Sequence, residues 1–171
     1  MEKSSVGGCL LGIVLLLSMD IVSLAQEPIK FMGIPVQGTE AEFQKQLSHN
    51  GFQKGSSGIS HHGQFNGKDV QVLLFSKENE IKKVCITYYV SMDIDGAFEE
   101  YNNLLRLYSM DRNFKAVFAH EMKTKKQFKQ SIEYGNHCYA EFKPTNCNGK
   151  VYFVVFPNVR DYVIALYYEN L

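Results

Sequence analysis

Residues 66–75 read NGKDVQVLLF, and residues 148–156 read NGKVYFVVF. Each stretch opens with Asn-Gly, a strong short signal for a hairpin turn, and continues into a run rich in β-branched and apolar residues. Outward from these runs, the order along the chain is helix, three strands, helix, and three or four strands. We therefore predict an α+β domain, in which two helix-plus-antiparallel-strand half-units form one sheet packed on helices. Because any two Asn-Gly hairpins look alike, a true internal duplication stays open.

The first half-unit is predicted to begin with a helix that starts at Thr39 and ends at Asn50-Gly51. Thr39 and Glu42 have the spacing of a capping box, and Asn50-Gly51 is typical of a helix end. A two-residue turn then pairs Phe65 with Lys68, which fixes the register of the first hairpin. The side chains expected on one common face are Ile59, His61, Gly63, Phe65, Val70, Val72 and Leu74, with Val84, Ile86, Tyr88 and Val90 from the third strand.

The second half-unit contains the clearest helix, because residues 97–108 carry one broad apolar stripe. Asp93 or Asp95 is expected to cap its N-terminus. The segments expected after it are a strand over 115–122, a short helical or irregular segment over 124–130, and strands over 138–143, 151–156 and 162–168. A two-residue turn at Asn148-Gly149 would place Cys147 opposite Lys150.

The N-terminal segment has the three parts of a secretory signal peptide: a short polar start that includes a lysine, an apolar run, and small residues before a cut between Ala25 and Gln26. We predict a signal peptide over residues 1–25 and a single α+β domain over residues 26–171. A membrane anchor is the alternative, but Asp20 leaves the apolar stretch shorter than the ~20 residues of a spanning helix. The expected location is the periplasm or the extracellular space, with no stable membrane span after cleavage.

Charge and cysteine content limit the partners and the bonds of the exported part. Residues 26–171 hold 17 basic and 16 acidic side chains, so we expect no nucleic-acid partner. Three cysteines remain there, at Cys85, Cys138 and Cys147. An oxidising compartment allows one internal disulfide and leaves one thiol over, and the sequence does not decide the pairing.

The domain resembles small secreted proteins of unknown function from Gram-negative gut bacteria. The residues that carry this likeness are FMGIPVQGT at 31–39, then Phe43, Leu47, Gly51 and Phe52. The Phe-x-Gly hairpin and the final Tyr-x-Val-x-Leu-x-Tyr-like strand of those proteins are similar to residues 65–67 and 162–168 here. The element order is also similar to the β-lactamase-inhibitor-protein-like architecture. The resemblance implies repeated helix-plus-strand units, and it brings no assigned activity and no catalytic residues.

The histidines and cysteines do not have the spacing of a known chemical site. His61 and His62 are neighbours on a predicted strand and face opposite ways, so they cannot ligate one metal together. His137 and Cys138 face apart for the same reason, and Cys138 is expected to be buried. The sequence contains no Gly-rich phosphate loop, no G-x-S-x-G elbow and no H-E-x-x-H motif. We therefore expect no metal, no cofactor and no catalytic residue.

The last strands are apolar on both faces, whereas the first strands alternate between apolar and polar residues. Their second face carries the candidate binding residues Tyr139, Tyr152, Phe156 and Tyr167. An exposed aromatic patch of this kind is typical of an interaction site. The alternative is that the segment over residues 115–130 covers this face.

These observations favour an exported, non-enzymatic binding module that recognises a protein or a cell-envelope component through a sheet face. Two alternatives stay open. One is a hydrolase or other enzyme whose site is assembled from distant residues such as His61 or His137. The other is a structural envelope protein that forms homo-oligomers by pairing edge strands.

Overall fold

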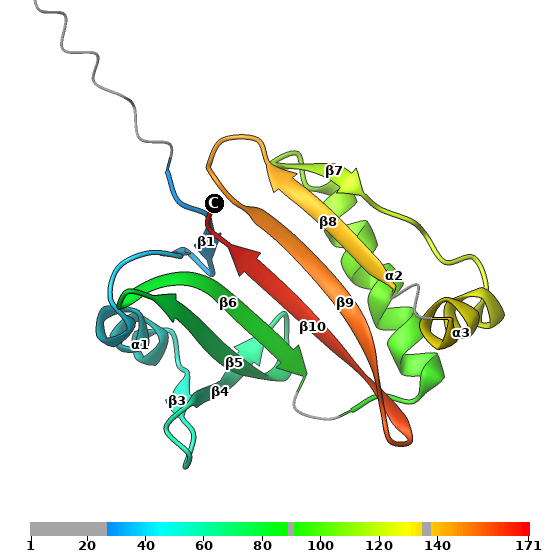
Figure 1. Cartoon of the computed structure of the whole chain (residues 1–171), viewed down its shortest axis with the longest axis horizontal. Coiled ribbons are helices and arrows are strands. Elements are labelled where there is room, and N and C mark those ends of the chain that lie inside the picture. Colours follow the sequence, from blue (N-terminus) through cyan, green and yellow to red (C-terminus); the bar gives the residue numbers. More distant parts are fainter. Residues whose placement is uncertain (1–26, 89–90, 135–137) are drawn as a thin grey trace, which may run out of the picture.

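The structure is a computed structural model that describes residues 27–88, 91–134 and 138–171 (Figure 1). The predicted signal peptide and the cleavage site between Ala25 and Gln26 lie outside these residues. The elements in chain order are β1 (Lys30–Phe31), β2 (Ile34–Pro35), α1 (Glu40–His49), β3 (Gln53–Lys54), β4 (Ser60–Phe65), β5 (Lys68–Lys77), β6 (Glu80–Tyr88), α2 (Ile94–Met110), β7 (Phe114–Phe118), α3 (Lys125–Glu133), β8 (Tyr139–Pro144), β9 (Lys150–Asn158) and β10 (Asp161–Glu169). Within the described ranges, no helix is long and apolar enough to cross a membrane.

Eight strands form one antiparallel sheet in the order β3-β4-β5-β6-β10-β9-β8-β7. Strands β3 to β6 follow one another in the first half of the sheet, and β7 to β10 do so in the second half. The halves meet where β6 pairs with β10, which are the last strands of the two half-units. Short strands β1 and β2 form a separate hairpin before α1. The predicted α+β class, with half-units of helix plus antiparallel strands, is confirmed.

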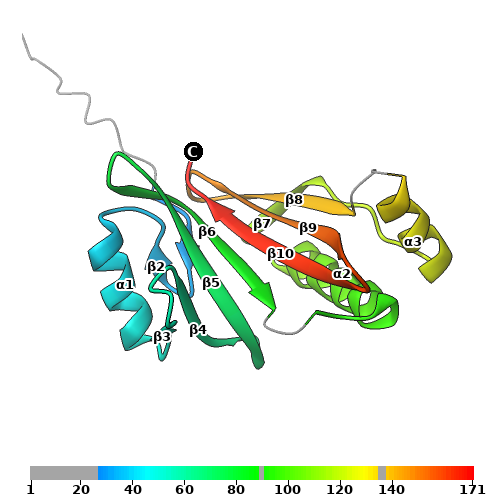
Figure 2. The same ribbon diagram turned by 60° about the horizontal axis from the view of Figure 1, so that its bottom comes forward.

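The helices lie on one side of the sheet, which we call the inner face; the opposite side is the outer face (Figure 2). The β1–β2 hairpin also packs on the inner face, because the ring of Phe31 lies 5.4 Å from that of Tyr168. Helix α3 packs beside α2, with the ring of Phe128 5.6 Å from that of Tyr101. The alternative in which residues 115–130 cover the second face is therefore wrong, since β7 extends the sheet and α3 lies on the inner side.

The helix starts follow their local signals. The Thr39 side chain accepts a hydrogen bond from the Glu42 N–H at 3.3 Å, and the Glu42 carboxylate accepts one from the Thr39 N–H at 3.0 Å, which confirms the capping box. Asp93, and not Asp95, is the N-cap of α2, and its carboxylate accepts a hydrogen bond from the Gly96 N–H at 2.7 Å. A side-chain oxygen thus satisfies an N–H that has no partner inside each helix.

The first hairpin has the predicted register, with Phe65 opposite Lys68 and His61 opposite Val72. The prediction for Ile59 is wrong: this residue lies before β4, and its side chain is 73% exposed. The loop before the strand explains the difference. A backbone hydrogen bond of 2.8 Å from Gly55 to Ser60 closes that loop, and β4 begins only at Ser60.

The β8–β9 connection differs from the predicted two-residue turn. The pairing of β8 with β9 leaves residues 145–149 as a wider loop, so Cys147 is not opposite Lys150. The Asn148 N–H instead donates a hydrogen bond of 2.9 Å to the carbonyl oxygen of Glu27. The loop is open because the segment before β1 docks against it.

The connection between β7 and α3 also differs from the prediction. The strand expected over 115–122 ends at Phe118, and the helical segment expected from residue 124 continues to Glu133. The Asn102 amide on α2 binds both backbone groups of Met122, donating to its carbonyl oxygen at 3.1 Å and accepting from its N–H at 3.3 Å. These two bonds hold Met122 against α2. A strand that continued to residue 122 would instead need this residue to pair with β8.

Candidate functional site

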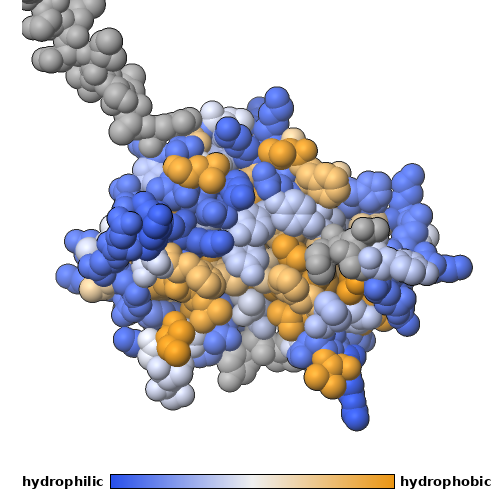
Figure 3. All heavy atoms as spheres, in the orientation of Figure 1, coloured by the Kyte–Doolittle hydropathy of each residue, from blue (hydrophilic) through white to orange (hydrophobic). Residues whose placement is uncertain are grey.

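Four aromatic side chains cross the outer face from strand to strand, and we call them the aromatic row: Phe118 on β7, Tyr139 on β8, Tyr152 on β9 and Tyr167 on β10. Neighbouring ring centroids lie 6.0, 5.9 and 4.7 Å apart in that order. The rings of Tyr152 and Tyr167 are stacked, with an interplanar angle of 13°. In the part of the chain that the structure describes, no helix lies over the row. Figure 3 looks onto this face and shows apolar and weakly polar side chains over the middle of the sheet, with hydrophilic residues around them.

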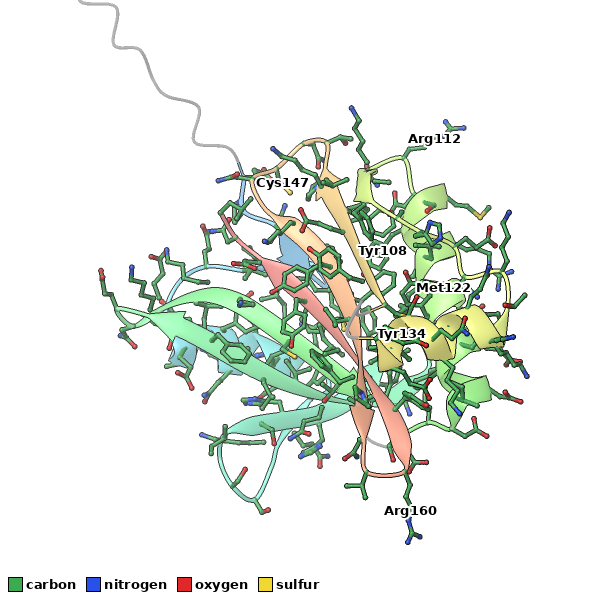
Figure 4. All side chains as sticks on the ribbon, turned by 45° about the vertical axis from the view of Figure 1, so that its right-hand side comes forward. Tyr108, Arg112, Met122, Tyr134, Cys147 and Arg160 are labelled. Carbon is green, nitrogen blue, oxygen red and sulfur yellow. The ribbon has the colours of Figure 1, made fainter. Side chains whose placement is uncertain are left out.

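The structure brings together three of the four sequence-predicted binding residues, namely the three tyrosines. Phe156 lies on the same face and is 38% exposed, but it pairs with Val163 farther along β9. It is nearer to the tip of the β9–β10 hairpin, where Arg160 lies in Figure 4. The fourth member of the row, Phe118, was missed, because a β-bulge between Ala116 and Phe118 sets which side of β7 it faces.

A group of two lysines and a glutamate lies along one flank of the row. Lys150 and Glu169 are each two residues from the row tyrosine of their own strand, and Lys83 on β6 lies opposite Glu169. The Glu169 carboxylate lies 3.8 Å from the amino group of Lys83 and 3.7 Å from that of Lys150. The Lys83 amino group lies 5.8 Å from the ring centroid of Tyr167, and the Lys150 amino group lies 5.0 Å from that of Tyr152. These cations hold the stacked rings in place by cation–π attraction.

The same flank ends on two lysines that directly oppose each other, Lys115 on β7 and Lys143 on β8. Like charges at opposed positions of neighbouring strands destabilise a sheet. Both side chains are exposed, and no carboxylate of the described residues forms an ion pair with either of them. We call Lys83, Lys115, Lys143 and Lys150 the basic flank. Beside the row, this flank outnumbers the outer-face carboxylates of Glu141 and Glu169, so this side of the sheet is positive.

The phenol groups of the row are neutral hydrogen-bonding groups at ordinary pH. Burial, with the nearby thiol of Cys85, raises the pKa of Tyr167 to about 12. Burial also raises the pKa of Tyr139 and of Tyr152, and the carboxylates of Glu141 and Glu169 add to the effect. The row therefore presents apolar rings that carry protonated hydroxyl groups, a combination that suits a partly wet interface.

The thiols do not form a reactive site. All three cysteines of the described residues are free, so no disulfide pairing among them is present. Cys138 is completely buried on the inner face, as predicted, and burial raises its pKa to about 12. Burial also raises the pKa of Cys147, which lies in the β8–β9 loop (Figure 4). A raised pKa disfavours the thiolate, which is the nucleophilic form. His137, the predicted neighbour of Cys138, lies outside the described residues.

His62 on β4 lies in a structural contact with Ser60. The Ser60 hydroxyl oxygen lies 3.3 Å from Nε2 of His62, but Ser60 is only 4% exposed. Gly55 presses on both side chains, because a Cβ atom at this residue would lie within 3 Å of each. A substrate could not reach the Ser60 hydroxyl without displacing this loop. Among the described residues, no group of three or more His, Cys, Asp and Glu side chains could hold a metal ion.

We expect His61 to make the stability of the fold depend on pH. Its side chain is 1% exposed on the inner face. Burial, and after it the nearby charge of Lys54, lowers the pKa of His61 below the ordinary value of 6.5. The charge of Glu40 acts in the opposite direction. The unfolded chain takes up a proton near pH 6.5 while the folded chain resists it, so stability is complete above that pH and is lost as the pH falls through it. We expect His61→Leu to reduce this loss between about pH 8 and about pH 5. Denaturant unfolding at both pH values measures it, and an unchanged loss in the variant would assign the effect to other groups.

Comparison with family models, with curated proteins and with solved structures finds no match to this chain. The resemblance to small secreted proteins of gut bacteria therefore stays a prediction.

Proposed function

We propose that the protein is an exported, non-enzymatic binding module that recognises a protein or a cell-envelope component through its outer face. The observation that carries this proposal is the aromatic row on a sheet face that no described helix covers. Export is supported by the signal-peptide pattern over residues 1–25.

The row has the chemistry of an interface centre. Tyrosine is enriched where proteins bind partners, because it offers a large contact area and a polar group at a small cost in side-chain entropy. In this row the cost is smaller still, since Tyr152 is already fixed by its stacking on Tyr167 and by the amino group of Lys150. A partner would therefore meet a platform that is ordered before binding.

Homo-oligomerisation by pairing of edge strands is less well supported. At one edge β3 has only two residues, and at the other edge β7 contains a bulge and an exposed lysine, Lys115. Short edge strands, bulges and edge lysines are features that oppose pairing with a second copy. For an enzyme, no specific observation among the described residues gives comparable support.

The proposal predicts that Tyr152→Ala weakens partner binding by about 2 kcal/mol, a factor of about 30, because central tyrosines of an interface contribute most of its affinity. The free energy of unfolding should fall by at most about 1.5 kcal/mol, since the ring is only half-buried and its removal costs the stacking on Tyr167 and the contact with Lys150. The protein without its signal peptide is cross-linked in a cell-envelope extract of its source, and the captured partner is titrated against both forms.

The matched control is Tyr134→Ala, because Tyr134 is 76% exposed next to the end of α3 and is not part of the outer face (Figure 4). This variant should bind the partner as the unchanged protein does. A partner that binds equally well to both variants would place its contact elsewhere. Capture of nothing except the protein itself would overturn the proposal and leave small-molecule and substrate screens as the next step.

A further inference from the structure

Strand β7 is the last strand of the eight-stranded sheet. It pairs with β8 on one side, and no described strand pairs with its other side, which is the open edge of the sheet. Four of its residues are exposed: Lys115, Ala116, Val117 and Phe118. An edge of this kind offers backbone N–H and C=O groups to another extended chain. Of the two ends of the sheet, this one borders both the aromatic row and the basic flank.

The side chains beside this edge favour one kind of occupant. Lys115 and Lys143 oppose each other on the outer face, and a carboxylate near their amino groups would offset the repulsion between them. Ala116 pairs with Phe142 on the inner side of the sheet and is exposed there. A chain lying along β7 would thus have Lys115 beside it and Lys143 one strand farther in on the outer face, and a small apolar residue beside it on the inner face.

A second copy of this protein does not fit the same edge. Two β7 strands brought together would bring Lys115 of each copy close to the basic flank of the other, and like charges at an interface oppose association. A membrane surface or a free anion would meet the lysines but leave the backbone groups of β7 unpaired. An acidic polypeptide in extended form satisfies both sets of groups.

We propose that β7 and the basic flank bind an extended acidic polypeptide segment, which adds to the sheet as a further strand and directs carboxylates on the outer face toward Lys115 and, beyond it on β8, Lys143. This inference rests on the proposed function, because it names the class of partner that meets one end of the outer face. Main-chain hydrogen bonds supply affinity in such strand addition, and alternate side chains supply specificity. The bulge after Ala116 limits the paired part of β7 to a short segment.

The probe is a short labelled peptide with blocked ends that alternates glutamate and valine, titrated by fluorescence anisotropy. We expect it to bind, and we expect amide hydrogen exchange of Ala116 to slow when it does, because the Ala116 N–H faces the open edge, whereas Lys115 pairs with β8. Replacing both Lys115 and Lys143 with glutamine should weaken binding about tenfold, since two exposed ion pairs are lost. The matched control replaces Lys45 and Lys126, two exposed helix lysines, with glutamine. It has the same net charge as the first variant, and it should bind the peptide as the unchanged protein does.

Two further peptides separate strand addition from simple charge attraction. One peptide is N-methylated at its glutamates and the other at its valines. Only alternate residues of an added strand direct their N–H groups to β7, so one of the two peptides should lose binding and the other should keep it. The inference is overturned if neither methylation weakens binding, if a lysine–valine peptide binds as tightly as the glutamate–valine peptide, or if no peptide binds. A partner from the envelope extract that requires Tyr152 but not the two lysines would also overturn it, and would leave the proposed function standing.

Discussion

Replacing Phe153 with alanine is expected to lower the free energy of unfolding by about 4 kcal/mol. Phe153 lies on the inner face of β9 and is completely buried. Its ring centroid lies 5.4 Å from that of Tyr101 and 6.2 Å from that of Phe142. Because these rings are fixed on α2 and β8, they cannot collapse into the cavity that alanine would leave. Denaturant unfolding monitored by circular dichroism measures the change.

The neighbouring residue provides the control, since Tyr152 faces the other side of the same strand. Tyr152→Ala should cost at most about 1.5 kcal/mol, because its ring is half-buried on the outer face and its removal opens no closed cavity in the core. Two adjacent substitutions should therefore differ by more than about 2 kcal/mol. Equal losses would show that the outer face is as buried as the inner face, which would contradict the proposed binding surface as well.

The helices and the first hairpin could be predicted because their signals are local. The capping box at Thr39 needs only residues of its own first turn, and the Asn-Gly turn before Lys68 fixes the β4–β5 register by itself. The apolar stripe of residues 97–108 shows which side of α2 is buried, whatever it packs against. In these places the local preference and the tertiary structure agree.

The β8–β9 connection could not be predicted because a distant segment decides it. Asn148-Gly149 has the same local signal as the first hairpin, but the Asn148 N–H is taken by Glu27, which precedes the domain's first strand. The end of β7 was missed for a similar reason, since Asn102 on α2 captures the backbone of Met122. Neither contact has a signature within a short window of sequence.

The candidate site was predictable in part. Period-two alternation placed Tyr139, Tyr152 and Tyr167 on one face, because neighbouring residues of a strand face opposite ways. Whether that face is covered depends on the side on which α3 packs, which periodicity does not show. Phe118 and the opposed lysines could not be assigned, since they depend on the bulged pairing of β7 with β8.

Gly149→Ala is expected to lower the free energy of unfolding by about 3 kcal/mol, from backbone strain and steric overlap together. Gly149 has a φ of 151°, which side chains of the L configuration avoid. A Cβ atom there would lie 2.8 Å from the carbonyl oxygen of Glu169 and 2.8 Å from the Cβ of Ile29. The first contact is with backbone and the second with a branched core side chain, so neither can move away easily. Amide hydrogen exchange of Asn148 should also become faster, as the loop loses its contact with the N-terminal segment.

The variant Gly51→Ala is the control that separates the cost of backbone strain from the cost of steric overlap. Gly51 has a φ of 85° at the end of α1, and an added Cβ atom would meet nothing within 4 Å. This variant should therefore cost only the conformational penalty, about 1 kcal/mol. In the two-residue turn that the sequence predicts, Gly149 would also have a positive φ but open space around it. A Gly149→Ala loss no larger than that of Gly51→Ala would favour this tight turn over the wider loop docked on the N-terminal segment.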